Sequence, residues 1–250
     1  MIASNATIRD VSARIDELFS RWDSGGDYRA VFICSYRDIT GRMQQAVTGG
    51  EFEDNHWMEG LDVEFAQIYF DAVGAYDSGT AGVPNCWRIA FDRACQKKST
   101  VLEDLLLGMN AHINHDLPVA LYQRSLAPAE RPVRERDYEK VNDLLAGMIK
   151  QIQNDVCSRY SFLLGFLDRA AGCADELLTD VGIRIARKRA WDNGITLADA
   201  PDENARAGLL AKLDKVASAK ALLLTAPGSR LSAPIRLLRS WDRALSHRFL

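Results

Sequence analysis

The side chains best suited to chemistry in this sequence lie between Gly108 and Pro118, at the end of its most apolar segment. His112 and Asp116 are four positions apart, so on a helix they project from the same face. An imidazole and a carboxylate one turn apart can ligate a divalent ion, or act as a base and the group that orients it. Burying such groups without partners would cost several kcal/mol. The plainer interpretation, a core histidine beside a capping aspartate, stays open.

Other side chains extend this candidate site. A metal ion held by His112 and Asp116 needs further ligands, for which we consider Asp62 and Asp137. The remaining catalytic candidates are His115, Asn114 and Arg187, and the substrate-binding candidates are Asn110, Trp57, Tyr69, Tyr138 and Asn142. Structural interpretations exist as well: Asp62 suits the start of a helix, Asp137 suits an N-cap, and tyrosines are commonly core residues.

Helical periodicity runs through almost the whole chain and predicts an all-α, single-domain bundle of about eight to ten helices. The helix over 99–115 is apolar on nearly all sides, which predicts that it lies at the centre. Pro118 and Gly194 are expected to follow the ends of their helices. The predicted helices are 7–22, 28–47, 59–76, 87–96, 99–115, 137–155, 159–172, 176–193, 205–225 and 235–249.

Composition narrows the classes of function. A net charge of −3 gives no electrostatic argument for nucleic acid as a partner. The five cysteines show no metal-type spacing, no run approaches the ~20 apolar residues of a membrane span, and no secretory leader is visible, so we expect a cytoplasmic protein. No phosphate-binding glycine motif is present, so no nucleotide cofactor is expected. Residues 226–250 predict a basic amphipathic helix docked on the domain, and 230–250 could contact a membrane surface or a protein.

Two resemblances add to this reading. The runs from Val83 to Phe91 and from Gly108 to Pro118, with its G-[IM]-N-A-H-I-N-x-D-L pattern, resemble an uncharacterised, mainly actinobacterial domain family of unknown function. This resemblance implies an intracellular helical domain and no particular activity. Leu107-Gly108 with His112 and Asp116 is also weakly similar to the helical zinc-dependent phospholipase C and P1 nuclease enzymes. The next histidine of that motif and its N-terminal tryptophan ligand are missing, which argues against a trinuclear zinc site.

Three functional hypotheses follow. The first is a metal-assisted hydrolase of a small or lipid-like substrate, with zinc, iron or manganese at His112 and Asp116. The second is a metal-free cyclase or isomerase of secondary metabolism, with His112 moving a proton in an apolar pocket between helices. The third is a non-catalytic binding or scaffold protein, in which the polar segment is a structural network.

Overall fold

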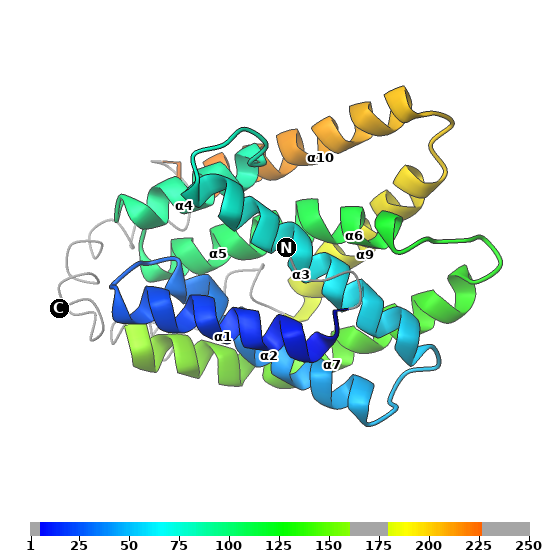
Figure 1. The fold of residues 1–250 in the computed structure, drawn as a ribbon, viewed down its shortest axis with the longest axis horizontal. Coiled ribbons are helices and arrows are strands. Elements are labelled where there is room, and N and C mark those ends of the chain that lie inside the picture. Colours follow the sequence, from blue (N-terminus) through cyan, green and yellow to red (C-terminus); the bar gives the residue numbers. More distant parts are fainter. Residues whose placement is uncertain (1–5, 161–179, 227–250) are drawn as a thin grey trace.

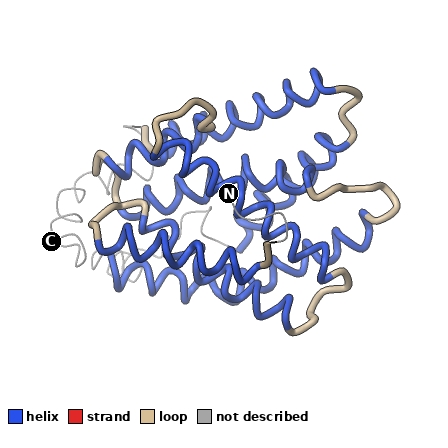
Figure 2. The backbone as a smooth tube through the Cα atoms, viewed as in Figure 1, coloured by secondary structure: helices blue, strands red, loops and turns tan. Residues whose placement is uncertain are grey.

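The computed structural model describes residues 6–160 and 180–226, and every regular element in these ranges is a helix (Figures 1 and 2). The prediction of an all-α fold is confirmed. The helices are α1 (Ile8–Ser24), α2 (Ala30–Thr48), α3 (Asn55–Asp77), α4 (Asn85–Cys95), α5 (Val101–Ala111), the π-helix η1 (His112–Asp116), α6 (Leu117–Gln123), α7 (Arg131–Tyr160), α9 (Asp180–Ala198) and α10 (Glu203–Leu224).

One helical rod, formed by α5, η1 and α6, passes through the middle of the bundle (Figure 1). Its start is set by a capping box, in which the Thr100 side chain accepts from the Glu103 backbone and the Glu103 side chain accepts in return. The rod continues through Pro118, so the expectation that this proline follows the helix end is wrong. Pro118 lies in the first turn of α6, directly after a wide π turn in which the Leu117 amide donates to the His112 carbonyl. The missing N–H of Pro118 therefore falls where the hydrogen-bond ladder already changes register.

The apolar core divides into two clusters along this rod. The first surrounds α5 and draws on α1, α2, α3, α4 and α10, with Leu106 and Leu107 among its most buried members. The second surrounds α6 and includes Leu117 and Leu121 together with residues of α3, α7 and α9. The π-helical segment lies between the two clusters, so its polar side chains interrupt a core that is otherwise apolar.

Further helix boundaries differ from expectation. The sequence predicts a connection over 127–136, but α7 begins at Arg131. Pro132 lies in its first turn, where backbone N–H groups have no acceptor within the helix, so the N–H that proline lacks is not needed there. Gly194 lies inside α9 and does not end it. A Cβ atom on Gly194 would lie 2.8 Å from Cβ of Leu121, so this glycine permits the close packing of α9 on α6. α7 continues without a break to Tyr160, so the expected helix end at 155 and the expected start of a new helix at 159 are wrong. The rest of the helix expected at 159–172, the start of 176–193, the helix expected at 235–249 and most of 226–250 lie outside the described residues.

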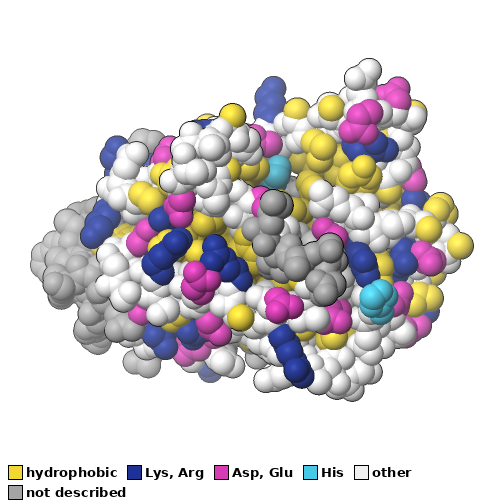
Figure 3. All heavy atoms as spheres, viewed as in Figure 1, with side chains coloured by type: hydrophobic (Ala, Val, Ile, Leu, Met, Phe, Trp, Pro, Cys, Tyr) yellow, Lys and Arg dark blue, Asp and Glu magenta, His cyan; other side chains and the backbone are white. Residues whose placement is uncertain are grey.

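On the face drawn in Figure 3, acidic and basic side chains are interspersed and neither sign forms a broad patch. None of the described helices combines the length and the apolar character that crossing a bilayer would require.

Candidate functional site

Asp116 is the centre of the polar network on η1. Its side chain is fully buried and each oxygen is engaged: His112 Nδ1 lies 2.9 Å from Oδ2, and His115 Nδ1 lies 2.7 Å from Oδ1. The indole Nε1 of Trp87, from α4, donates to both oxygens at 2.9 and 3.1 Å. Burial alone would raise the pKa of Asp116, but the hydrogen bonds from the two histidines outweigh it and hold the pKa below its ordinary value. Asp116 is therefore a carboxylate, which accepts and never donates.

The state of His112 follows from this partner. Because Asp116 only accepts, Nδ1 of His112 must carry a proton and donate it. Burial lowers the pKa of His112 and outweighs the opposing effect of Asp116. At neutral pH the imidazole is consequently uncharged, with an unprotonated Nε2. That atom is buried and has no hydrogen-bond partner among the described residues.

The pKa of His115 is shifted in the opposite direction. Burial opposes its charge, but the hydrogen bond to Asp116 and the nearby carboxylates of Asp116 and Asp214 raise its pKa above the ordinary value. Asp214, on α10, accepts the backbone N–H groups of Asn85 and Cys86 at the start of α4. The surroundings of His115 thus favour its protonated form on the α4 and α10 side, whereas burial favours the neutral form of His112 on the other side.

Aromatic rings fix the orientation of His112. The ring of Phe65, from α3, is stacked on the imidazole with centroids 3.6 Å apart and planes only 9° from parallel. Tyr36, from α2, meets it edge-on at 4.6 Å, and Phe32 does so at 5.7 Å. Phe32 can approach because position 108 is glycine: a Cβ there would lie 2.4 Å from the Phe32 ring. The imidazole is therefore held both by its hydrogen bond and by the packing of its faces.

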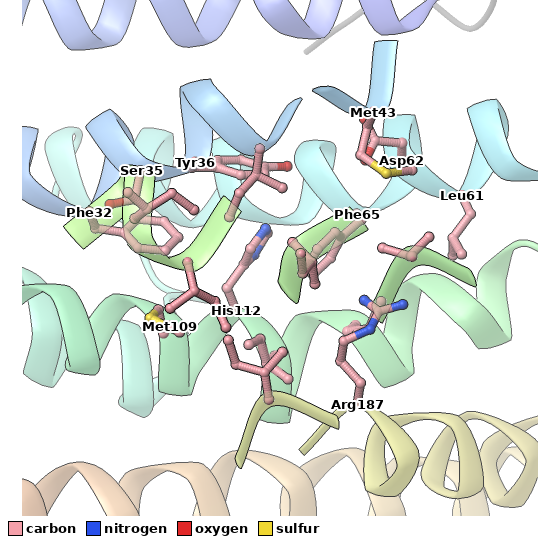
Figure 4. A pocket seen from close by; sticks show the side chains of 18 of the residues that line it. Phe32, Ser35, Tyr36, Met43, Leu61, Asp62, Phe65, Met109, His112 and Arg187 are labelled. Carbon is pink, nitrogen blue, oxygen red and sulfur yellow. The ribbon is translucent and has the colours of Figure 1, made fainter. Parts of the chain in front are cut away.

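A cavity of about 120 Å³ lies beside this ring, between α2, α3, η1, α7 and α9 (Figure 4). For comparison, an apolar cavity of about 150 Å³ takes up benzene in another protein. Most of its wall is apolar, with Met43, Leu61, Phe65, Met109, Leu117 and Leu145 among the lining side chains. His112, Asp62, Arg187, Ser35 and Tyr36 contribute polar groups to the same wall. An apolar cavity with a few convergent polar groups is the usual form of a small-molecule site.

Asp62 is the second titratable group of the cavity. It is buried, its Oδ2 has no partner in the described part of the chain, and it lies close enough to Tyr36 to raise the pKa of that phenol further. Burial, with a smaller effect from Glu59, raises the pKa of Asp62 to about 7. A large fraction of the molecules therefore carry Asp62 as a neutral carboxylic acid at neutral pH.

Arg187 is the third titratable group of the cavity. Its Nε donates to Oδ1 of Asn142 at 2.7 Å, and its Nη2 donates to the carbonyl of Tyr138 at 2.9 Å. The guanidinium also lies over the Tyr138 ring, 4.2 Å from its centroid, and the Tyr138 hydroxyl donates to the Arg187 carbonyl. The structure thus brings together four predicted site residues, His112, Arg187, Tyr138 and Asp62, on one cavity wall, with Asn142 directly behind Arg187.

The remaining predicted residues serve other contacts. Asn110 donates to the Ala217 carbonyl of α10, and Asn114 accepts from Lys220 of the same helix, so neither lines the cavity. Trp57 and Tyr69 are core residues: the indole of Trp57 donates to the Arg124 carbonyl, and the Tyr69 ring packs on Trp87. These four side chains hold the helices around the site.

The metal-ligand set expected from the sequence is not assembled. Both oxygens of Asp137 accept backbone N–H groups at the entry to α3, from Glu53 and Asp54, at 2.8 Å each. Asp116 has its two oxygens occupied by three donors. Across residues 6–160 and 180–226, no three His, Cys, Asp or Glu side chains are grouped so that they could hold a metal ion.

Several important residues were missed from the sequence. Trp87, Phe65 and Tyr36 are absent from the predicted site, yet they bind Asp116 or enclose His112. A signal existed for Trp87, because a buried indole N–H needs an acceptor and a buried carboxylate needs donors. No local pattern indicates the contact of Phe65 with His112, which joins residues 47 positions apart.

Fold and site together define a class: an all-α protein with a buried, aromatic-enclosed His–Asp pair beside an apolar cavity. The chain belongs to a family of unknown function, DUF5995, which it matches over residues 8–227. This finding confirms the expected membership of an uncharacterised domain family. The comparison with curated proteins gave no match, and neither did the comparison with solved structures.

Proposed function

We propose that this protein is an enzyme that moves a proton on a small, mainly apolar substrate in the central cavity, with His112 as the acid–base group. The observation that carries the proposal is that the two ring nitrogens of His112 have different surroundings. Nδ1 is bound to the buried Asp116, while Nε2 has no partner among the described residues on a ring that lines the cavity. This arrangement suits a general base with a fixed tautomer.

Asp62 provides the complementary group. A neutral imidazole and a carboxylic acid with a pKa of about 7 line the same cavity. His112 Nε2 would take a proton from a C–H or O–H of the substrate, and the Asp62 carboxyl would give one to another atom. The substrate then keeps its composition, so the reaction class is an isomerisation, or a cyclisation that proceeds by proton transfer. Enzymes commonly use two titratable groups for such chemistry, one whose surroundings favour accepting a proton and one whose surroundings favour donating it.

The hydrogen bonds already made by Asp116 favour this reaction over metal-assisted hydrolysis. A hydrolase using His112 and Asp116 as ligands would have to release Asp116 from Trp87 and His115, leaving buried donors without an acceptor. Proton transfer at Nε2 leaves every one of these hydrogen bonds in place.

The proposal can be tested without knowing the substrate. Cyclohexanone and cyclohex-2-enone have ring sizes close to that of benzene and carry C–H groups that a base can remove. The first step is to establish binding by saturation transfer from the protein to the ketone. The loss of ketone α-proton signals in D₂O is then followed by ¹H NMR. We expect the wild type to exchange a bound ketone ~10²–10⁴ times faster than His112→Gln, in line with the usual contribution of a general base.

Controls separate the three hypotheses. His56→Gln, at an exposed histidine of α3, should exchange at the wild-type rate. A chelator should change nothing, and a loss of exchange on its addition would favour the metal-assisted reaction. A ketone that binds but exchanges equally fast in the wild type and in His112→Gln would contradict the proposal and favour a non-catalytic binding protein.

A further inference from the structure

Arg187 is a buried cation on the wall of the cavity, and its charge is not neutralised by the described residues. Only 7% of the residue is exposed, and none of its hydrogen-bond partners among residues 6–160 and 180–226 is a carboxylate. Its two hydrogen-bond acceptors, the Asn142 amide and the Tyr138 carbonyl, are both neutral. Burying an unpaired guanidinium costs several kcal/mol, which neutral acceptors offset only in part.

One guanidinium nitrogen of Arg187, a residue that lines the cavity, is left without a hydrogen-bond partner among the described residues. Nε and Nη2 are engaged by α7, whereas Nη1 makes no hydrogen bond to any described residue. In Figure 4 the Arg187 side chain extends from α9 with its guanidinium nitrogens toward the cavity, on the same side as the His112 ring. A water molecule there would satisfy the N–H groups but would leave the positive charge uncompensated.

We infer that Arg187 binds the carboxylate of a small, apolar monocarboxylic acid, whose body fills the cavity next to His112. This inference rests on the proposed function in taking the same cavity as the substrate site, and it names the class of substrate. A guanidinium edge matches a carboxylate better than any other side chain does. Arg187 is the one Lys or Arg found among the described lining residues, which suits a monoanion and not a phosphate dianion.

The rest of the wall fits the other end of such a molecule. Met43, Leu61, Leu145 and Ile149 offer apolar contacts, and about 120 Å³ accommodates a body close to a benzene ring in size. Asp62 lines the same cavity, and as a neutral acid it would not repel a bound anion. Anchoring the carboxylate at Arg187 would fix the position of the body relative to Nε2 of His112, which is what a positioned proton transfer needs.

The test compares benzoate with benzamide, which has nearly the same shape and no charge. Isothermal titration calorimetry near neutral pH, where benzoate is ionised, should give benzoate a dissociation constant about ten- to a hundredfold lower than that of benzamide. Arg187→Gln should remove this preference, and Arg187→Lys should keep part of it. Arg184→Gln is the matched control, because Arg184 is one turn earlier on α9 and its side chain pairs with Asp143 and Asp180 at the surface.

The wild-type comparison alone keeps the inference falsifiable if Arg187→Gln does not fold. Equal affinities for benzoate and benzamide, or a preference for benzoate that persists in Arg187→Gln, would overturn it. Neither result would touch the proposed function, because exchange of an uncharged ketone depends on His112 and not on Arg187. Conversely, failure of the ketone exchange would leave a benzoate preference intact and assign this cavity to acid binding alone.

Discussion

Trp87 donates its single indole N–H to both carboxylate oxygens of Asp116, and so joins α4 to the π turn of the central rod. Hydrogen bonds to a charged group contribute more than neutral ones, and their loss leaves a buried carboxylate with fewer donors. We therefore expect Trp87→Phe to lower the free energy of unfolding by about 1–3 kcal/mol beyond the packing loss. Urea denaturation of the purified protein measures this difference.

Trp191→Phe is the matched control for that measurement. Trp191 is just as buried, but its indole nitrogen has no hydrogen-bond partner in the described residues, so its removal costs packing only. Equal losses in the two variants would show that the bond between Trp87 and Asp116 adds nothing to stability. A larger loss in Trp87→Phe, together with a slower ketone exchange, would link this bond to the orientation of His112.

Gly108 sets the distance between α2 and the central rod. A methyl group there would overlap the Phe32 ring, which in turn meets the His112 ring edge-on. We expect Gly108→Ala to lower the free energy of unfolding by about 1–3 kcal/mol, as overpacking of a core does. Gly147→Ala, in α7 with no atom within 4 Å of the new methyl group, should instead raise it by about 0.5–1 kcal/mol. Thermal unfolding of both variants distinguishes a packing effect from a change in helix propensity.

Asp62 should make stability depend on pH. Burial raises its pKa from 3.8 to about 7, so the folded state holds a proton that the unfolded state releases. The stabilising effect of the neutral form is complete below about pH 4 and is lost as the pH rises through 7. Asp62→Asn should therefore match the wild type near pH 4 and exceed its unfolding free energy by roughly 2–4 kcal/mol at pH 8.

The measurement is denaturation at several pH values, with Glu64→Gln as the control on the same helix. Glu64 is half-buried and does not line the cavity, so Glu64→Gln shows how the pH profile responds when α3 loses a carboxylate outside the cavity. A constant difference between Asp62→Asn and the wild type from pH 4 to 8 would show that Asp62 has an ordinary pKa. It could then not be the proton donor of the proposed reaction at neutral pH.

The sequence was informative where an interaction is local and silent where it is not. The spacing of His112 and Asp116 predicted their contact correctly, because residues four apart lie on one helix face. The partners that give this contact its properties, Trp87 and Phe65, come from other helices. Pro118 and Gly194 carry strong stop signals, but a π turn and the close packing of α9 on α6 override them. The carboxylate of Asp137 is chemically suited to bind a metal ion, but only the fold shows that both of its oxygens accept backbone N–H groups at the entry to α3.

The two histidines that share Asp116 should titrate in different ranges. Burial lowers the pKa of His112 below 6.5, whereas the carboxylates of Asp116 and Asp214 raise the pKa of His115 above it despite burial. His115 should therefore gain its proton first as the pH falls from 8, and His112 should follow only below pH 6.5. Ketone exchange should rise with pH through the pKa of His112, because only the neutral imidazole accepts a proton, and should fall above about 7 if Asp62 must donate one.

Nitrogen-15 NMR of the histidine rings, assigned with His112→Gln and His115→Gln, measures both titrations and identifies the tautomer. Between the two pKa values, His112 should show a protonated Nδ1 and an unprotonated Nε2, as the hydrogen bond to Asp116 requires. Each shifted pKa also makes the free energy of unfolding depend on pH. The stabilising contribution of neutral His112 is complete above pH 6.5 and is lost as the pH falls through its lowered pKa. The stabilising contribution of protonated His115 is complete below pH 6.5 and is lost as the pH rises through its raised pKa. A neutral His115 beside a charged His112 at pH 6.5 would reverse the assignment, and Nε2 of His112 would then be a proton donor to the cavity.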